Sequence, residues 1–261
     1  MTSDGPSELS GPAATAAVPE AAATTDRSWR AGRVIALVTL VVLGLAGVLG
    51  GGFALRRELT RGATKAEVAA ALAAEIGSRW ERLPAGTIFP GKISYPDVAG
   101  NTATATRVGI APRTTCRAAL EPAAVAQLRS MHCATMLRAT YLSAGGSIAA
   151  TIGVAVLPSV ATAEKAQSDL TLQPGSGLYA LPYARTMAGS FTNAARAAAG
   201  AQFAGPYLFL FTAGYTDGQP GSAVAAGDSG ELAALGAGIV RMLAKTLTSH
   251  GPPCSMRDIS C

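Results

Sequence analysis

The sequence predicts an α+β domain built on an antiparallel sheet and preceded by one transmembrane helix. Three observations support this class. An apolar run near the N-terminus is long enough to span a bilayer, short β-type segments follow it, and helical patterns separate these segments. The order strand, helix, strand, strand, helix, strand matches a ferredoxin-like core with split βαβ topology, to which a helix is added at each end.

The composition argues against a nucleic-acid partner. Only 14% of the 261 residues are charged, against about 25% in a typical soluble domain. The formal net charge is +5, but the lysines and arginines are scattered singly and form no basic run. The chain is long enough for one good-sized domain with appendages.

Residues 1–33 are predicted to be a disordered cytoplasmic tail. They are mostly Ala, Pro, Ser, Thr and Gly, with almost no large apolar side chain before Trp29. Such a segment buries too little surface to offset the entropy lost on ordering.

Residues 34–55 are predicted to be a transmembrane helix. The 22 residues carry no charge, and at about 1.5 Å each they cover roughly 33 Å, against a hydrocarbon core of roughly 30 Å. A cleaved signal peptide fits less well, because the leader and the apolar run are too long and no good A-x-A site follows the run. Gly47 and Gly51 form a G-x-x-x-G, which permits a weak homodimer, although a glycine-rich span also produces this spacing by chance.

The cysteines indicate which side of the membrane the domain occupies. All four lie beyond the predicted span, at Cys116, Cys133, Cys254 and Cys261. An even number on one side indicates disulfides in an oxidising compartment, so we expect the C-terminal domain outside the cell membrane and the N-terminus in the cytoplasm. Arginines flank both ends of the span in near balance, and long domains translocate largely regardless of charge.

Three disulfide pairings are open, and the two sequence-local ones are favoured. Cys116–Cys133 and Cys254–Cys261 would close loops worth about 3 and about 2.5 kcal/mol. Zinc is the alternative, because His132 and His250 lie nearby. No Cys-x-x-Cys unit exists, so the sequence predicts neither a metal nor a cofactor.

Residues 56–82 are predicted to contain a juxtamembrane helix, and residues 83–261 the extracytoplasmic α+β domain. In "TKAEVAAALAAEIGSRWERL", the apolar residues Leu72, Ile76 and Trp80 recur every fourth position. Strands are then predicted within residues 87–101, 102–112, 133–142, 147–157 and 206–215, and short helices at 121–131 and 159–170. The alanine-rich stretch 188–204 is ambiguous.

Two segments carry finer predictions. In residues 148–156 the even positions are bulky apart from Ala150 and the odd positions are small, which indicates a strand with its bulky side on a core and a close neighbour opposite. "DSGE" at residues 228–231 begins the last helix, where Asp228 and Glu231 fit a capping box.

The stretches "CATMLRATYLSAGGSIAATIGVAVLPSVATAEKA" and "GPYLFLFTAGYTDGQ" resemble segments of uncharacterised single-pass membrane proteins from high-GC Gram-positive bacteria. The resemblance covers residues 75–250. It implies an anchored extracytoplasmic domain and supplies no catalytic residues.

One pair of motifs suggests catalysis. "MHC" around His132 and "GDSG" around Ser229 resemble the histidine and serine signatures of chymotrypsin-like proteases. The serine motif here runs into a helix, the spacing is short, and no motif places an orienting acid. The carboxylates between them and elsewhere, such as Glu121 and Asp169, are interpreted as isolated surface charges. The sequence therefore favours a non-catalytic binding or scaffolding module at the cell envelope, with an envelope hydrolase using Ser229 as the alternative.

Overall fold

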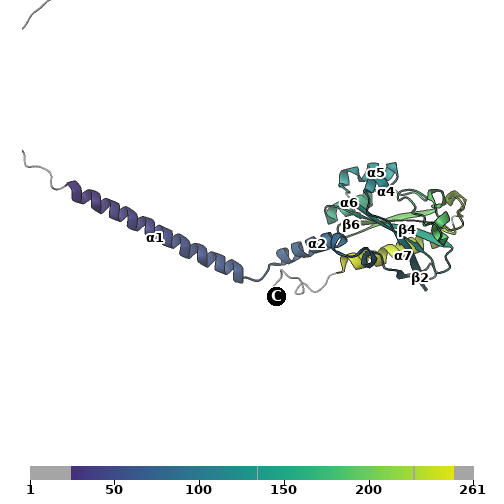
Figure 1. The fold of residues 1–261 in the computed structure, drawn as a ribbon, viewed down its shortest axis with the longest axis horizontal. Coiled ribbons are helices and arrows are strands. Elements are labelled where there is room, and N and C mark those ends of the chain that lie inside the picture. Colours follow the sequence, from purple (N-terminus) through teal and green to yellow (C-terminus); the bar gives the residue numbers. More distant parts are fainter. Residues whose placement is uncertain (1–24, 134, 226, 250–261) are drawn as a thin grey trace, which may run out of the picture. The chain divides into compact units, whose positions relative to one another are not determined.

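The computed structural model describes residues 25–133, 135–225 and 227–249 (Figure 1). Most of the predicted tail at residues 1–33 lies outside these ranges, and so do all residues after Ser249. The chain divides into two units, one ending at Gly62 and the other beginning at Ala63.

The first unit contains α1, Thr25–Thr60. Its segment Gly32–Thr60 is, by length and composition, apolar enough to cross a membrane. This segment contains the predicted span at residues 34–55. The one polar residue of the span 34–55, Thr39, donates its hydroxyl to the Ile35 carbonyl at 2.9 Å, so this polar group is satisfied within the helix.

The second unit is an α+β domain. Its α-helices are α2 Lys65–Arg82, α3 Ala85–Ile88, α4 Cys116–Ala119, α5 Pro122–Leu128, α6 Val160–Asp169 and α7 Ser229–Thr248. Its strands are β1 Lys92–Pro96, β2 Thr102–Ile110, β3 Thr135–Leu142, β4 Ile148–Val156, β5 Ala198–Ala204 and β6 Tyr207–Tyr215. Short 3-10 turns are η1 Arg129–Met131, η2 Met187–Ser190, η3 Asn193–Ala195 and η4 Gly221–Ala223.

The six strands form one antiparallel sheet in the order β1-β2-β3-β4-β6-β5. This confirms the predicted class but not the ferredoxin-like core. The helices between β2 and β3 do not carry the chain past a strand, because β2 and β3 pair directly. Among strands consecutive in the described chain, only β4 and β5 are not direct neighbours: they run parallel with β6 between them, so the two split crossovers of a ferredoxin-like core are not present.

Helix α7 covers one face of the sheet (Figure 1). It contacts the edge strands β1 and β5 as well as the inner strands β4 and β6, so the sheet curls around it. Glycines permit this close approach. A Cβ on Gly236 would lie 2.1 Å from the Phe211 ring, and one on Gly238 would lie 2.6 Å from the Tyr95 Cβ.

Helices α4, α5 and α6 cover the opposite face (Figure 1). The prediction for β4 is confirmed: Ile152 and Val154 pack on the α7 side, whereas Ala149 and Ala155 pack on the opposite side of the sheet. At Gly153 a Cβ would lie 2.9 Å from the Met136 sulfur, so the covering layer sits close to the strand. Strand β6 is buried along nearly its whole length, as its continuous apolar sequence predicts.

The predicted capping box of α7 is wrong. Asp228 makes no capping hydrogen bond, because its own backbone is helical (φ −86°, ψ −16°) and not extended. A capping box begins α2 instead. The Thr64 hydroxyl accepts from the Glu67 N–H at 3.3 Å, and the Glu67 carboxylate accepts from the Thr64 N–H at 2.8 Å.

Candidate functional site

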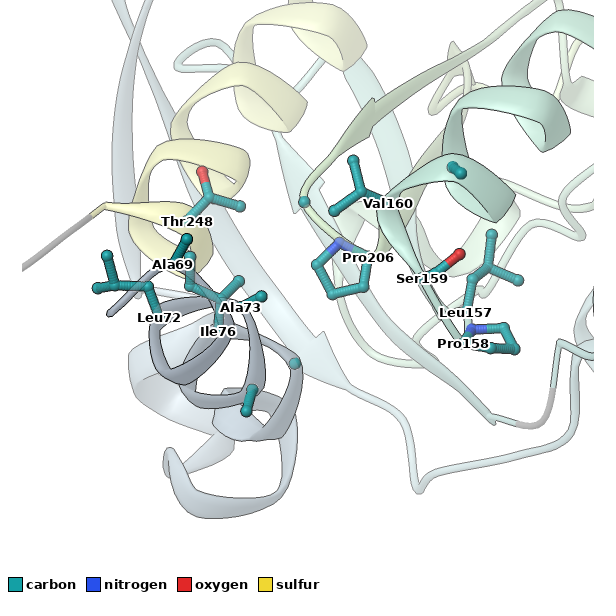
Figure 2. Close-up of a pocket in the computed structure, with 14 residues that line it drawn as sticks. Ala69, Leu72, Ala73, Ile76, Leu157, Pro158, Ser159, Val160, Pro206 and Thr248 are labelled. Carbon is teal, nitrogen blue, oxygen red and sulfur yellow. The ribbon is translucent and has the colours of Figure 1, made fainter. Parts of the chain in front are cut away.

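A groove with a volume of about 930 Å³ runs along α2. Helix α2 forms one wall with Leu72, Ala73 and Ile76, and the connections after β4 and β5 form the other (Figure 2). Thr248, the last residue of α7, lies at one end. None of the described residues that line the groove is charged. The groove is therefore a predominantly apolar concavity of the size used for small-molecule binding.

Three contacts hold the α2 wall in place. The Ile76 side chain is buried in the main core, and the Tyr207 hydroxyl donates to the Ile76 carbonyl. Arg79 donates to the carbonyls of Leu247 and Ser249 at 2.9 and 2.6 Å, which ties α2 to the end of α7. These bonds also satisfy carbonyls that the end of α7 leaves unpaired.

The opposite wall is equally well fixed. The Leu157 N–H donates to the Pro206 carbonyl at 3.0 Å, which joins the two connections. Ser159 caps α6 by accepting from the Thr162 N–H at 3.1 Å. Gly205 occupies the turn before Pro206 with φ +56°, a conformation that favours glycine.

The groove has little capacity for chemistry. Its two hydroxyl side chains are already used: Ser159 caps α6, and Thr248 donates to the Ala244 carbonyl at 2.8 Å. Its lining, as far as the structure describes it, contains no acid, base or cysteine. It therefore provides apolar contact area without a nucleophile or a proton-transfer group.

A second cavity, of about 480 Å³, lies beside the predicted Cys116–Cys133 disulfide, which the structure contains. The two Cα atoms are 6.0 Å apart. Arg117, Arg129 and His132 line the cavity together with both cysteines. The charge on its lining is positive, in contrast to the uncharged groove along α2.

A buried ion pair lies behind this cavity. The Tyr179 ring lines the cavity, and the Arg196 guanidinium lies 5.8 Å from the centre of that ring. Arg196 is 6% exposed and donates to Glu121, which also accepts from the Gly177 N–H at 3.0 Å. Partial burial by itself raises the pKa of Glu121, but these hydrogen bonds and the Arg196 charge outweigh it and lower the pKa. The interpretation of Glu121 as an isolated surface charge is wrong.

Two buried polar atoms, Arg138 Nε and Tyr183 Oη, have no hydrogen-bond partner among the described residues. Burial lowers the pKa of Arg138, opposed by the nearby Tyr183, and raises the pKa of Tyr183, opposed by Arg138 and Arg107. Neither Arg138 nor Tyr183 lines the groove or the disulfide cavity.

The structure does not bring His132 and Ser229 together. His132 precedes β3 and ends η1, which packs with the α4–α6 layer. Ser229 begins α7 on the other face, and a Cβ on the adjacent Gly230 would lie 3.9 Å from Val98 in the β1–β2 turn. That turn lies beyond the far end of β3, whose eight residues span roughly 23 Å. A catalytic pair needs hydrogen-bond reach, so this pair is not one.

The remaining predicted site residues are only partly described. Cys254, Cys261 and His250 lie outside the described residues. Within the described ranges, no three or more His, Cys, Asp and Glu side chains gather closely enough to hold a metal ion. Gly47 and Gly51 lie on α1, and a Cβ at either would have open space around it.

Sequence reasoning missed the groove. The spacing of Leu72 and Ile76 predicted an apolar face on α2, but such a face is equally suited to full burial. The groove's opposite wall comes from segments more than 80 positions further along the chain, around Pro158 and Pro206. No local pattern indicates that these segments leave a gap along α2.

Comparison of the chain with protein-family models, with curated proteins and with solved structures gives no match. The two cavities must therefore be interpreted from their own chemistry.

Proposed function

We propose that this protein is a membrane-anchored extracytoplasmic binding module, with its N-terminus in the cytoplasm. The helix Gly32–Thr60 supports the anchor by its length and apolar composition. The Cys116–Cys133 disulfide supports an oxidising compartment for the domain, because such bonds persist mainly outside the cytosol.

The groove along α2 is the proposed binding site, and its ligand is a hydrocarbon chain. The observation that carries this choice is the lining, which has no charge and whose two hydroxyls, on Ser159 and Thr248, are already hydrogen-bonded. An extended peptide brings backbone N–H and C=O groups that need partners. A hydrocarbon chain needs none, and it gains free energy simply by leaving water.

The same lining supports a role in binding and not in catalysis. The described lining of the groove offers no acid, base or cysteine, and His132 and Ser229 lie too far apart to act as a nucleophile and its base.

Protease accessibility of intact cells tests the topology. Added protease should remove an epitope placed after Cys261 and spare one placed before Met1. Removal of the N-terminal epitope alone would contradict the proposed orientation.

Site-specific photo-crosslinking of the full chain in its native membrane tests the ligand. A benzophenone amino acid replacing Ala73, inside the groove, should give adducts with acyl chains that mass spectrometry identifies. The matched control is Ala70, which lies exposed on the same helix and does not line the groove. Equal lipid adducts at both positions, or peptide adducts at Ala73 alone, would reject a hydrocarbon ligand.

A further inference from the structure

The disulfide cavity has an unbalanced positive lining. Arg117, Arg129 and His132 all line it, and the described residues of its lining include no aspartate or glutamate. Ion pairs elsewhere in the domain neutralise arginines, as Glu75 does for Arg79 at 2.8 Å. The cavity is therefore a concave surface on which arginine side chains gather without carboxylates.

These side chains are available to a ligand. Within the part of the chain that the structure describes, Arg117, Arg129 and His132 make no hydrogen bond or ion pair. Glu121, which precedes the α5 wall of the cavity, is already bonded to Arg196 and to the Gly177 N–H. The guanidinium donors in the cavity thus have no acceptor among the described residues.

The frame around the cavity is held by covalent and conformational restraints. The disulfide joins α4, which begins at Cys116, to the segment that follows η1. His132 has a left-handed backbone (φ 52°, ψ 38°), one of two described non-glycine residues with positive φ. Such a conformation in a residue other than glycine persists where its surroundings enforce it, and functional sites are common among these places.

We infer that this cavity binds a phosphate group attached to an organic molecule. Two guanidinium groups suit a phosphate, whose terminal oxygens accept charge-assisted and bidentate hydrogen bonds. The volume of about 480 Å³ exceeds what a bare phosphate needs. The remaining lining, with Leu120, Val125 and the Tyr179 ring, offers apolar and aromatic contact for an attached organic body. This inference does not depend on the proposed ligand of the groove along α2.

The phosphate has two chemical sources, a soluble phosphate ester or a lipid headgroup. The full chain in dodecyl maltoside micelles, which contain no phosphate, is titrated calorimetrically with glycerol 3-phosphate and separately with dihexanoyl phosphatidic acid. Both should bind, and added NaCl should weaken both because the arginines are exposed. A preference of tenfold or more for the phosphatidic acid identifies a lipid headgroup, whereas equal affinities identify a soluble ester.

The decisive variants are Arg117→Gln and Arg129→Gln. Each should weaken glycerol 3-phosphate binding about tenfold, since hydrogen bonds to charged groups are among the stronger ones. Both side chains are exposed, so the variants should keep the wild-type unfolding midpoint. Arg241→Gln removes the same charge from an exposed position on α7, across the sheet, and should leave the affinity unchanged.

Three results would overturn the inference. The first is wild-type protein that binds neither phosphate compound at millimolar concentration. The second is an equal loss of affinity in Arg241→Gln, which would mean attraction to net charge and not to this cavity. The third is glycerate binding as tightly as glycerol 3-phosphate, which would show that the cavity recognises a carboxylate as well as a phosphate and has no preference for phosphate. Reduction of the Cys116–Cys133 bond should weaken binding, because it releases one wall of the cavity.

Discussion

The two faces of the sheet are covered by layers of opposite design. One face is covered mainly by α7, a single 20-residue helix that packs through apolar side chains. The other is covered by pieces, among them α4 with four residues and α5 with seven, together with turns and loops. This second layer carries the Cys116–Cys133 disulfide and the Glu121–Arg196 pair.

The difference follows from helix length. A helix of 20 residues presents several turns of apolar surface to the sheet, so burial alone can hold it. A helix of four or seven residues buries little and is not stable by itself, so it depends on links to other segments. The disulfide and the Glu121–Arg196 pair therefore lie on the face where the chain is most fragmented, and that face also contains the cationic cavity.

The largest expected effect is loss of Arg196. Its guanidinium joins Glu121, the Leu178 carbonyl and the Asn193 carbonyl, the last two at 3.0 Å each. Arg196→Met takes the donor from the Leu178 and Asn193 carbonyls as well as the cation from Glu121, and should lower the free energy of unfolding by about 3–5 kcal/mol, measured by urea unfolding of the full chain in detergent. In the double variant with Glu121→Gln the loss should be smaller than the sum of the two single losses, because no unpaired charge remains. A loss below about 1 kcal/mol would show that this layer does not depend on the pair.

Removing the disulfide should have the next largest effect. The loop between Cys116 and Cys133 has a sequence separation of 17, so the double variant Cys116→Ser, Cys133→Ser should lose about 3 kcal/mol of stability. Hydrogen exchange should rise first in α4 and α5 and leave α7 protected. Equal deprotection of α7 would contradict the distinction between the two layers.

The stability of the α7 layer should depend on close packing more than on polar or covalent links, so a substitution that crowds this layer should destabilise the domain. Gly236→Ala places a Cβ 2.1 Å from the Phe211 ring and should cost about 1–3 kcal/mol through overpacking. Gly230→Ala, on the same helix, meets only Val98 at 3.9 Å. That control should be neutral or slightly stabilising, because alanine favours helix over glycine. Thermal unfolding of both variants decides the prediction.

The N-cap residues of α2 and α7 should contribute unequally to stability, because only α2 has a side-chain cap. Thr64→Ala removes the capping box of α2 and should cost about 1 kcal/mol. Asp228→Ala removes no capping bond from α7 and should change stability by less than about 0.5 kcal/mol. A larger loss in Asp228→Ala than in Thr64→Ala would reverse the assignment of the two caps.

The smallest expected effect is an acid dependence that arises from Glu121. Its pKa in the folded state lies below the ordinary value of 4.5. The stabilisation is therefore fully present above pH 4.5 and is lost as the pH falls through the lower folded pKa. Glu121→Gln should lack this part of the acid-side slope in unfolding experiments. The contribution is modest, because the side chain is 26% exposed and solvent screens it.

Local patterns predicted elements well. Alternation predicted both faces of β4, and the continuous apolar run predicted buried β6. Strand β5 was not recognised, because its alanine-rich sequence lacks an alternating pattern. Local patterns also could not predict the order of the strands in the sheet, since β4 pairs with β6 and not with β5, the strand that follows it in sequence.

The site was less predictable than the fold. Cys116 and Cys133 lie close enough in sequence for loop entropy to favour their pairing. Glu121 and Arg196 are 75 positions apart, and neither is distinguished by its neighbours. The same holds for the charge of the disulfide cavity, which arises because the fold places Arg117 and Arg129 on one concave surface.

The attachment of α2 has a mechanical consequence. Tension on the chain at Ala63 passes into α2 and reaches the sheet near the other end of that helix, through the Tyr207 bond to Ile76 and the Arg79 bonds to the end of α7. The turns of α2 between Ala63 and these bonds are therefore under tension before the force reaches the sheet. Because α2 also forms one wall of the groove, tension that detaches α2 from the sheet would open the groove.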